Sequence, residues 1–352
     1  MSKFFISKIK TLLKIFKLLL KPYEAQPLTE FNNKDIENID FSLKRKKNLK
    51  KKRKFYIIRR SPGAGLFSNF IYVLNHLNIA NSCKFYPVID MENYTTIYNE
   101  RKSVNKSFNS WNYFFDLKKK VDLKKIYNNE IVFLSSNKFY KKFSHNIHNN
   151  FYRKLFNKYF KIKKIHLEFV KYFSNKYFKK DKILAIHYRG TSYKTSANHP
   201  FPPTIKQSII LIKKIIKKYK FTKIFLCTED LSYLDSIRKE FKNITIYLKD
   251  SYRSKKDDAF KNYPRKLHRY KLGKEILIES LLISKCNGFL YCNTNVSEFV
   301  KFLDKKKKIK YFLIENGFNS SNEYLAKWLW LYKNTFPKLL GGFKDKVHVK
   351  NV

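Results

Sequence analysis

Arginine, glycine, proline and tryptophan are scarce in this sequence. Eleven of the 76 basic residues are arginine, and the 352 residues include 8 glycines, 9 prolines and 3 tryptophans. Lysine, asparagine, isoleucine, phenylalanine and tyrosine are abundant, as expected of an A+T-rich coding sequence. The net charge of +49 therefore does not by itself indicate nucleic-acid binding, and nucleic acid is not an expected partner. We expect the charge to favour association with anionic membranes.

Cysteine patterns and metal-binding motifs are also missing. The four cysteines lie in apolar segments without CxxC spacing or neighbouring histidines. This pattern predicts reduced core cysteines in a cytoplasmic protein. The pair Asp257-Asp258 lies in a charged loop and is no DxD motif, so we expect no metal. A hydrophobic fraction of 43% and an aromatic fraction of 17% are enough for a core, which excludes wholesale disorder.

The first 54 residues differ in character from the rest. Residues 1–22 carry apolar and lysine positions at helical spacing, but Lys14 and Lys17 interrupt the apolar stretch and no small-residue cleavage site follows. The segment thus predicts neither a transmembrane helix nor a cleaved signal. A helix lying on an anionic bilayer is one interpretation, and a helix docked on the protein itself is the other. Residues 21–54 are interpreted as a solvated lysine-rich linker.

The pattern becomes globular at Phe55. Residues 55–60 predict a buried strand, 61–65 a tight turn, 66–80 a helix and 84–90 a second strand. Residues 91–180 are less regular and are expected to be largely helical. A second series begins at residue 182 and alternates strands with helices. Its strands are expected at 183–188, 223–228, 244–248, 289–293 and 310–315, and its helices at 204–219, 231–241, 272–286, 295–304 and 325–334.

Strands that alternate with helices favour parallel sheets, whose ligands bind at the carboxyl ends of the strands. Two such series predict an α/β protein with two lobes and a cleft between them. The predicted boundaries are 1–54 for the helix and linker, 55–180 for the N-terminal lobe, 181–340 for the C-terminal lobe and 341–352 for a tail.

The segment AIHYRGTS, residues 185–192, ends a predicted strand with a rare arginine. Arginine presents a rigid fork of donors that suits phosphate better than the point charge of lysine. His187 and Arg189 project the same way along the strand, which predicts an anion site. A structural arginine paired with a buried carboxylate is the alternative for Arg189, and a core histidine is the alternative for His187.

Three further segments combine strand ends with polar or glycine residues. The turn SPGAG, with Gly63 and Gly65, opens a helix and allows close approach of a ligand, although a plain β-α turn explains it too. CNTNVSEF opens another helix with capping residues whose free N–H groups favour an anion, or which simply cap. The acids in TED, residues 228–230, either contact a ligand or cap the next helix.

Taken together, GAGLFSNFIYVLNHL, PVID, HYRGT, FLCTED and ILIESLLISKCNGFLYCNTNVSEF resemble the GDP-fucose fucosyltransferase superfamily, over roughly residues 55–315. The resemblance implies a GT-B-type glycosyltransferase fold of two Rossmann-like lobes, with an acceptor-side N-terminal lobe and a C-terminal lobe that binds the nucleotide sugar. It implies inverting transfer of fucose from GDP-fucose, without a metal or other cofactor. The expected acceptor is a glycan or a lipid-linked glycan, met in the cytoplasm with peripheral association at the membrane face.

The resemblance also implies residue roles. Arg189 matches the arginine that holds the donor β-phosphate, with His187 beside it, and Glu279 matches an acid that faces guanine. Thr294, Asn295 and Ser297 match a segment that meets the pyrophosphate. In the N-terminal lobe, the expected acceptor-side or loop residues are Gly63, Gly65, Asn69 and Asp90.

The sequence departs from the family where a catalytic base is expected. Gly190 and Ser192 stand where relatives place a second arginine and an aspartate, and the usual glutamate is missing near Ser196. His199 or Asp90 could substitute as the base, or GDP itself could take part in proton removal. Two other classes stay open: a polyanion- or membrane-binding protein, and a non-catalytic glycan-binding relative of the transferases.

Overall fold

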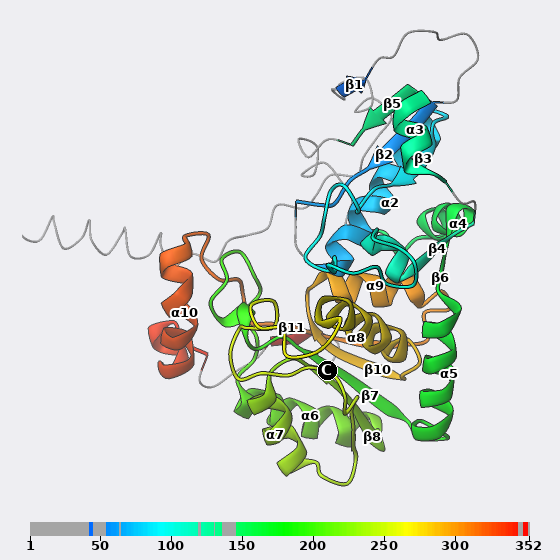
Figure 1. The fold of residues 1–352 in the computed structure, drawn as a ribbon. Helices are drawn as coiled ribbons and strands as arrows, with labels where there is room; N and C mark the ends of the chain where they lie inside the picture. Colours follow the sequence, from blue (N-terminus) through cyan, green and yellow to red (C-terminus); the bar gives the residue numbers. More distant parts are fainter. Residues whose placement is uncertain are drawn as a thin grey trace, which may run out of the picture.

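Two β-sheets organise the described part of the chain (Figure 1). The computed structural model describes residues 42–44, 54–62, 65–118, 121–129, 131–135, 146–343 and 348–350. The proposed N-terminal helix and most of the linker lie outside these ranges. Within them, no helix has the length and apolar character needed to cross a bilayer.

The N-terminal sheet has the strand order β1-β5-β2-β3. Strand β2 is parallel to both β3 and β5, whereas β1 is antiparallel to β5. The expectation of a solvated linker is corrected at residues 42–44, which form β1 and pair with β5. The bounds are Ser42–Lys44 for β1, Lys54–Ile58 for β2, Tyr86–Ile89 for β3 and Ile131–Leu134 for β5.

Helices cover both faces of the N-terminal sheet. Helix α2, Leu66–Ser82, is buried along most of its length against one face. Helix α3, Leu123–Asn129, contributes Ile126 to a small cluster on the other face. The strand, turn, helix and strand expected from residue 55 onward are therefore confirmed.

The C-terminal sheet has the order β12-β11-β10-β7-β8-β9. Its strands are parallel except β12, which pairs antiparallel with β11. The predicted strand at 244–248 is shorter than expected, because only two of its residues pair with β8. The bounds are Ile183–Tyr188 for β7, Lys223–Thr228 for β8, Thr245–Ile246 for β9, Gly288–Cys292 for β10, Lys310–Glu315 for β11 and His348–Lys350 for β12.

Two helical layers sandwich this sheet, and the side chains of β7 alternate between them. Leu184 and Ile186 belong to the core shared with α6 and α7, whereas Ile183 and Ala185 belong to the core shared with α8 and α9. Figure 1 shows α8 and α9 between the two sheets and α6 and α7 on the far side. The bounds are Ile205–Tyr219 for α6, Leu231–Glu240 for α7, His268–Ile283 for α8, Asn295–Leu303 for α9 and Glu323–Thr335 for α10.

The region between the sheets is less helical than the sequence predicts. Strands β4 and β6 form an antiparallel ribbon, joined to a one-turn η2 helix by an aromatic cluster around Trp111. The extended pieces arise because bulky aromatic residues fill the space beside α2. The bounds are Ser110–Tyr113 for η2, Phe115–Leu117 for β4, Asn150–Tyr159 for α4, Phe160–Ile162 for β6 and Lys164–Tyr177 for α5.

One hydrophobic core runs across both sheets. Phe67 and Phe70 of α2 meet Phe299 of α9, with ring centroids 4.1 and 4.8 Å apart. Such aromatic contacts bury large areas and add geometric preference to the packing. They hold the start of α2 against α9, and this fixes the glycine turn relative to the C-terminal sheet.

Candidate functional site

The parallel strands of the C-terminal sheet end at a common edge, which holds the predicted donor-binding residues. The strand register pairs His187 of β7 with Cys227 of β8 and Tyr291 of β10. Arg189 therefore leaves the sheet between Glu229, which follows β8, and the turn that starts α9. Because ligands of parallel α/β sheets bind outside the carboxyl ends of strands, this edge is the candidate site.

Arg189 contacts groups from three neighbouring positions at this edge. Its Nε lies 3.6 Å from Oε1 of Glu229, its Nη2 donates to Oγ of Ser192 at 3.2 Å, and its guanidinium lies 5.0 Å from the Tyr193 ring centre. Burial opposes its charge, but Glu229 and Tyr193 outweigh burial and raise the pKa of Arg189. The Nε is buried without a hydrogen-bond partner in the described chain, so it keeps a donor for a ligand.

The two acids after β8 have different roles. Glu229 is the carboxylate that the structural interpretation of Arg189 required, but it is partly exposed and also accepts from the Thr191 hydroxyl at 3.1 Å. Asp230 accepts from the backbone N–H of Tyr233 at 3.0 Å and so caps α7, and it pairs with Lys194 at 3.0 Å. Of the two roles considered for the acids in TED, Asp230 therefore has that of a helix cap.

His187 is buried at the end of β7. Burial, together with the charge of Arg189, lowers the pKa of His187 to about 3. The imidazole is therefore neutral at physiological pH and does not add charge to a phosphate site. The alternation along β7 puts His187 on the same face as Ile183 and Ala185, toward α8.

Gly190 is required by close packing and not by its backbone angles. A Cβ at this position would overlap the Tyr188 ring and would lie 2.5 Å from Oδ2 of Asp230. The Tyr188 ring cannot move aside freely, because it stacks on Tyr233 with centroids 3.5 Å apart. The second arginine that the fucosyltransferase family has at this point would therefore not fit at position 190.

We expect Gly190→Ala to destabilise the protein by about 1–3 kcal/mol, the usual cost of overpacking. Thermal and urea unfolding of the variant measure this cost. Gly65→Ala is the matched control, because a Cβ at Gly65 meets no atom within 4 Å and its φ of −70° suits any residue. Equal stability of Gly190→Ala and the wild type would contradict the close packing at β7.

Glu279 of α8 lies in the interior of this edge beside an arginine that the sequence analysis missed. Its carboxylate is 4.0 Å from Nη2 of Arg253, and the two side chains are only 12% and 5% exposed. The position of Glu279 therefore does not fit the alternative of an exposed helix residue one turn after Glu275. Burial raises the pKa of Glu279 to about 8, with Arg253 opposing the rise and Glu275 and Glu229 adding to it.

Arg253 reaches this place through backbone pairing of its loop. The neighbouring Ser254 donates to the carbonyl of Glu229 at 2.9 Å and accepts from Leu231 N at 3.0 Å. Nη1 of Arg253 donates to the Ser251 carbonyl at 3.0 Å, but Nε and Nη2 are buried without hydrogen-bond partners among the described residues. Buried unsatisfied donors are costly, so these two N–H groups need a further acceptor, from a ligand or a water molecule.

The start of α9 forms a capping box. The Thr294 hydroxyl accepts from Ser297 N at 3.2 Å, and the Ser297 hydroxyl donates to the Thr294 carbonyl at 2.6 Å. The hydroxyls that were expected to meet the pyrophosphate therefore serve the helix itself. Asn295 is partly exposed in the first turn, where backbone N–H groups lack intrahelical partners and favour an anion.

His199 lies close to the arginine motif. Its ring is 4.5 Å from that of Tyr193, which in turn lies under Arg189. Nδ1 lies 2.7 Å from the carbonyl of Ala197 and must donate to it, so the neutral ring keeps Nε2 unprotonated. Burial, and to a lesser degree Arg189, lowers the pKa of His199, so that this nitrogen can accept a proton at neutral pH.

The predicted residues of the N-terminal half hold turns. Asn69 is 2% exposed, accepts from Ser61 N at 2.8 Å and donates to the Gly65 carbonyl at 3.3 Å. These bonds stabilise the glycine turn, so the expectation that Asn69 faces a sugar is not carried further. Gly65 caps α2 on this turn, and Gly63 lies outside the described residues.

Asp90 is fully buried at the end of β3. Its carboxylate accepts from the backbone N–H groups of Glu92 and Asn93, from the Asn93 side chain at 2.8 Å and from the Tyr127 hydroxyl at 2.8 Å. Four hydrogen bonds to both oxygens leave it no evident capacity for catalysis. Asp90 is therefore a structural acid, and the interpretation as a substitute base is not carried further.

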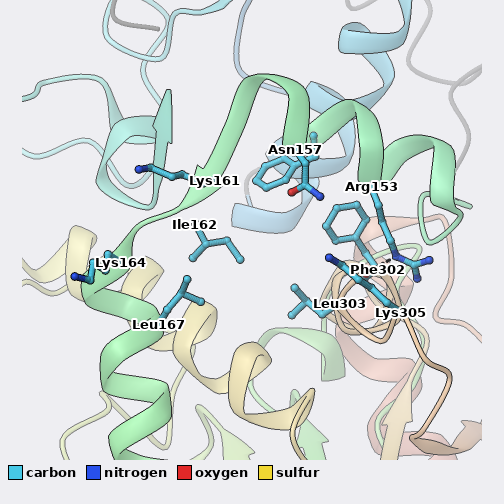
Figure 2. A pocket seen from close by; sticks show the side chains of 10 residues that line it. Arg153, Asn157, Lys161, Ile162, Lys164, Leu167, Phe302, Leu303 and Lys305 are labelled. Atoms are coloured by element: carbon cyan, nitrogen blue, oxygen red, sulfur yellow. Dashed lines mark hydrogen bonds between the residues drawn. The ribbon is translucent and has the colours of Figure 1, made fainter. Parts of the chain in front are cut away.

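A separate cavity of about 440 Å³ lies away from this edge. Figure 2 shows Ile162, Leu167 and Leu303 around it, with Arg153 and Lys305 on one side. Its lining comes from segments that precede β7 and β11, so it lies where the parallel strands begin. The Arg153 guanidinium is already bonded to the carbonyls of Lys301 and Phe302, and the cavity is not part of the candidate site.

The parallel C-terminal sheet with helices on both faces makes this an α/β protein. No family model matches its sequence, and no curated protein does. Its structure is similar to the fucosyltransferase NodZ from Bradyrhizobium, with 13% identity and a TM-score of 0.48 over 76% of this chain and 96% of NodZ. It is also similar to NodZ alpha-1,6-fucosyltransferase soaked with GDP-fucose, with 14% identity and a TM-score of 0.48 over 75% of this chain and 95% of that chain. The similarity to POFUT1 in complex with GDP has 10% identity and a TM-score of 0.44, over 75% of this chain and 99% of POFUT1.

Proposed function

We propose that the chain is an inverting glycosyltransferase that uses GDP-fucose as its donor. The observation that carries the proposal is the cluster of Arg189, Arg253 and Glu279 at the carboxyl edge of the C-terminal sheet. Both arginines have buried N–H groups without hydrogen-bond partners among the described residues. Burial raises the pKa of Glu279 to about 8, so that its carboxyl group is largely protonated at neutral pH. Such a cluster suits a ligand that has both phosphate groups and a hydrogen-bonding base.

Glu279 and Arg253 would read the guanine base. Guanine offers two donors, N1–H and N2–H, to a carboxylate, and two acceptors, O6 and N7, to an arginine fork. Adenine offers the opposite pattern at its six-position, so the pair would reject it. The binding of guanine would also supply acceptors for the unpartnered Nε and Nη2 of Arg253.

Arg189 and the start of α9 would hold the diphosphate. Negative charge grows on the leaving diphosphate as the acceptor hydroxyl attacks C1 of fucose from the opposite face. Donors aimed at that charge stabilise the transition state by on the order of 3 kcal/mol each. No metal or further cofactor is called for in this proposal, because arginine and backbone N–H groups supply the positive charge.

His199 would take the proton from the acceptor hydroxyl through Nε2. We expect His199→Asn to lower kcat by about 100- to 10,000-fold, the usual range for a general base. Because the pKa of His199 is below its ordinary value, the kcat of the wild type should be level at neutral and alkaline pH and fall in acid. The measurement is kcat against pH for both proteins, with the dissociation constant for GDP as the control, which should not change. Full activity in His199→Asn would instead favour proton removal by GDP itself.

The donor assignment is tested by direct assay of the purified full chain. Hydrolysis and transfer from GDP-fucose are compared with GDP-mannose, ADP-sugars and UDP-sugars, with glycan and lipid-linked glycan acceptors. We expect binding of GDP-sugars and transfer from GDP-fucose. Binding of no GDP-sugar would refute the donor assignment, and binding without any turnover would favour a non-catalytic relative.

A further inference from the structure

The outer face of α10 and the short η5 helix after it, Lys338–Leu340, carry large apolar side chains in solvent. These residues form the α10 stripe: Tyr324 is 79% exposed, Trp328 70%, Leu331 53%, Leu339 95% and Leu340 54%. The first three are spaced by four and three positions, so they share one face of the helix. The opposite face is buried, with Ala326 and Leu329 at 0% and 5% exposure.

This stripe has the composition of a membrane-interface surface. Tryptophan and tyrosine prefer the headgroup level of a bilayer, and leucine reaches the acyl boundary below it. The described segment that carries the stripe is basic, since residues 323–343 contain three lysines and one acid. Lysines close to an anionic leaflet are attracted to its surface.

We propose that the α10 stripe docks on the surface of an anionic bilayer. A chain with a net charge of +49 repels a second copy of itself, whereas an anionic surface attracts it. Apolar anchors and flanking cations together give stable binding, where either alone is marginal. The occupant that best fits both the exposed anchors and the charge is therefore lipid.

Docking here would bring the candidate site to the bilayer. The inner face of α10 packs on the η4 turn, Ser192–Lys194, which directly follows Arg189. The Lys194 ammonium lies 5.2 Å from the Trp330 ring centre, and Asn319 donates to the Ala326 carbonyl at 3.0 Å. Figure 1 shows α10 at the side of the molecule, on the opposite side of the C-terminal sheet from α5. The proposal does not depend on the identity of the donor.

The chain contains its own probe for this interaction. Of the three tryptophans, Trp111 is 1% exposed and Trp330 is half-buried, so Trp328 alone is freely exposed to water. Tryptophan emission of the full chain is measured with vesicles of phosphatidylcholine and phosphatidylglycerol, and with pure phosphatidylcholine. We expect a blue shift and quenching by brominated acyl chains with the anionic vesicles only, and loss of both changes in Trp328→Phe.

Vesicle sedimentation measures the binding itself. We expect Trp328→Ser with Leu331→Ser to lower the partition coefficient on the order of tenfold. The matched control is Ile165→Ser with Tyr172→Ser on α5, where both side chains are 59% exposed. The control should bind as the wild type does, and circular dichroism should show the same fold for all variants.

Four results would overturn the proposal. Unchanged Trp328 emission in vesicle-bound protein, with wild-type binding by the serine variant, would assign binding to another segment such as residues 1–22. A blue shift that grows with protein concentration without lipid would assign the stripe to a second copy. Protection of Trp328 from acrylamide in the lipid-free monomer would mean that the chain covers its own stripe. Equal binding to neutral vesicles would remove the role of anionic lipid.

Discussion

Replacement of Arg189 by alanine is expected to lower kcat/KM for transfer from GDP-fucose by about 100- to 1,000-fold. The guanidinium lies at the end of β7 with a buried Nε that has no hydrogen-bond partner in the described chain, and Glu229 keeps it charged. Its donors act on the diphosphate charge that develops in the transition state. We therefore expect kcat to fall more than the affinity for GDP-fucose, and steady-state kinetics with a titration of GDP separate the two effects.

Two variants control this experiment. Arg189→Lys keeps the charge but loses the planar fork, so we expect it to recover only part of the lost activity. Arg238→Ala removes an exposed arginine of α7 that lies over Tyr247, and it should leave kcat and KM unchanged. Full activity in Arg189→Ala would show that the diphosphate is held elsewhere. An equal loss in Arg238→Ala would assign the effect to general charge.

The positions of the strands follow from local patterns, which is why most of them could be predicted. All six residues of β7 are buried, and runs of this kind between turn residues predict strands of a parallel sheet. The scarcity of arginine drew attention to Arg189, and the motif resemblance to Glu279. In contrast, β1 in the linker and the ribbon of β4 with β6 depend on pairing between distant segments, which no local pattern contains.

Arg253 shows the same limit at the level of the site. It lies in a charged loop, and only the backbone pairing of Ser254 with Glu229 brings it to the strand edge. One signal was present in the sequence, because Arg253 is another of the eleven arginines. Asn69 and Asp90 show the reverse difficulty, because polar residues that stabilise turns and residues that bind ligands have the same chemistry, and the sequence alone does not separate them.

The second prediction with a large expected effect is the loss of GDP affinity when Glu279 is replaced. We expect Glu279→Gln to weaken GDP binding by about 10- to 100-fold, because guanine loses a charged acceptor, and to leave the weak binding of ADP unchanged. Isothermal titration with both nucleotides measures the difference. A similar loss for GDP and ADP would place Glu279 away from the base, and wild-type affinity for GDP would remove it from the site.

The raised pKa of Glu279 makes this binding depend on pH. Guanine requires the carboxylate, whereas the free protein holds a proton on Glu279 below its pKa of about 8. GDP binding should therefore release a proton, and it should tighten by up to about tenfold per pH unit as the pH rises toward 8. Above pH 8 the affinity should be level, and Glu279→Gln should show no such slope. Proton release is counted by titration in buffers of different ionisation enthalpy.

Arg253 provides a test that a merely structural residue would not pass. Its charge opposes the rise in the pKa of Glu279, so Arg253→Met should move the midpoint of the pH dependence above 8 as well as weaken GDP binding.

Thermal unfolding of Glu279→Gln tests whether its weaker GDP binding comes from a folding defect. The raised pKa means that the free energy of unfolding of the wild type falls as the pH rises from the ordinary carboxyl range to about 8. Glutamine does not ionise, so the free energy of unfolding of Glu279→Gln does not fall in this way. At pH 8 the variant should be at least as stable as the wild type while binding GDP less well.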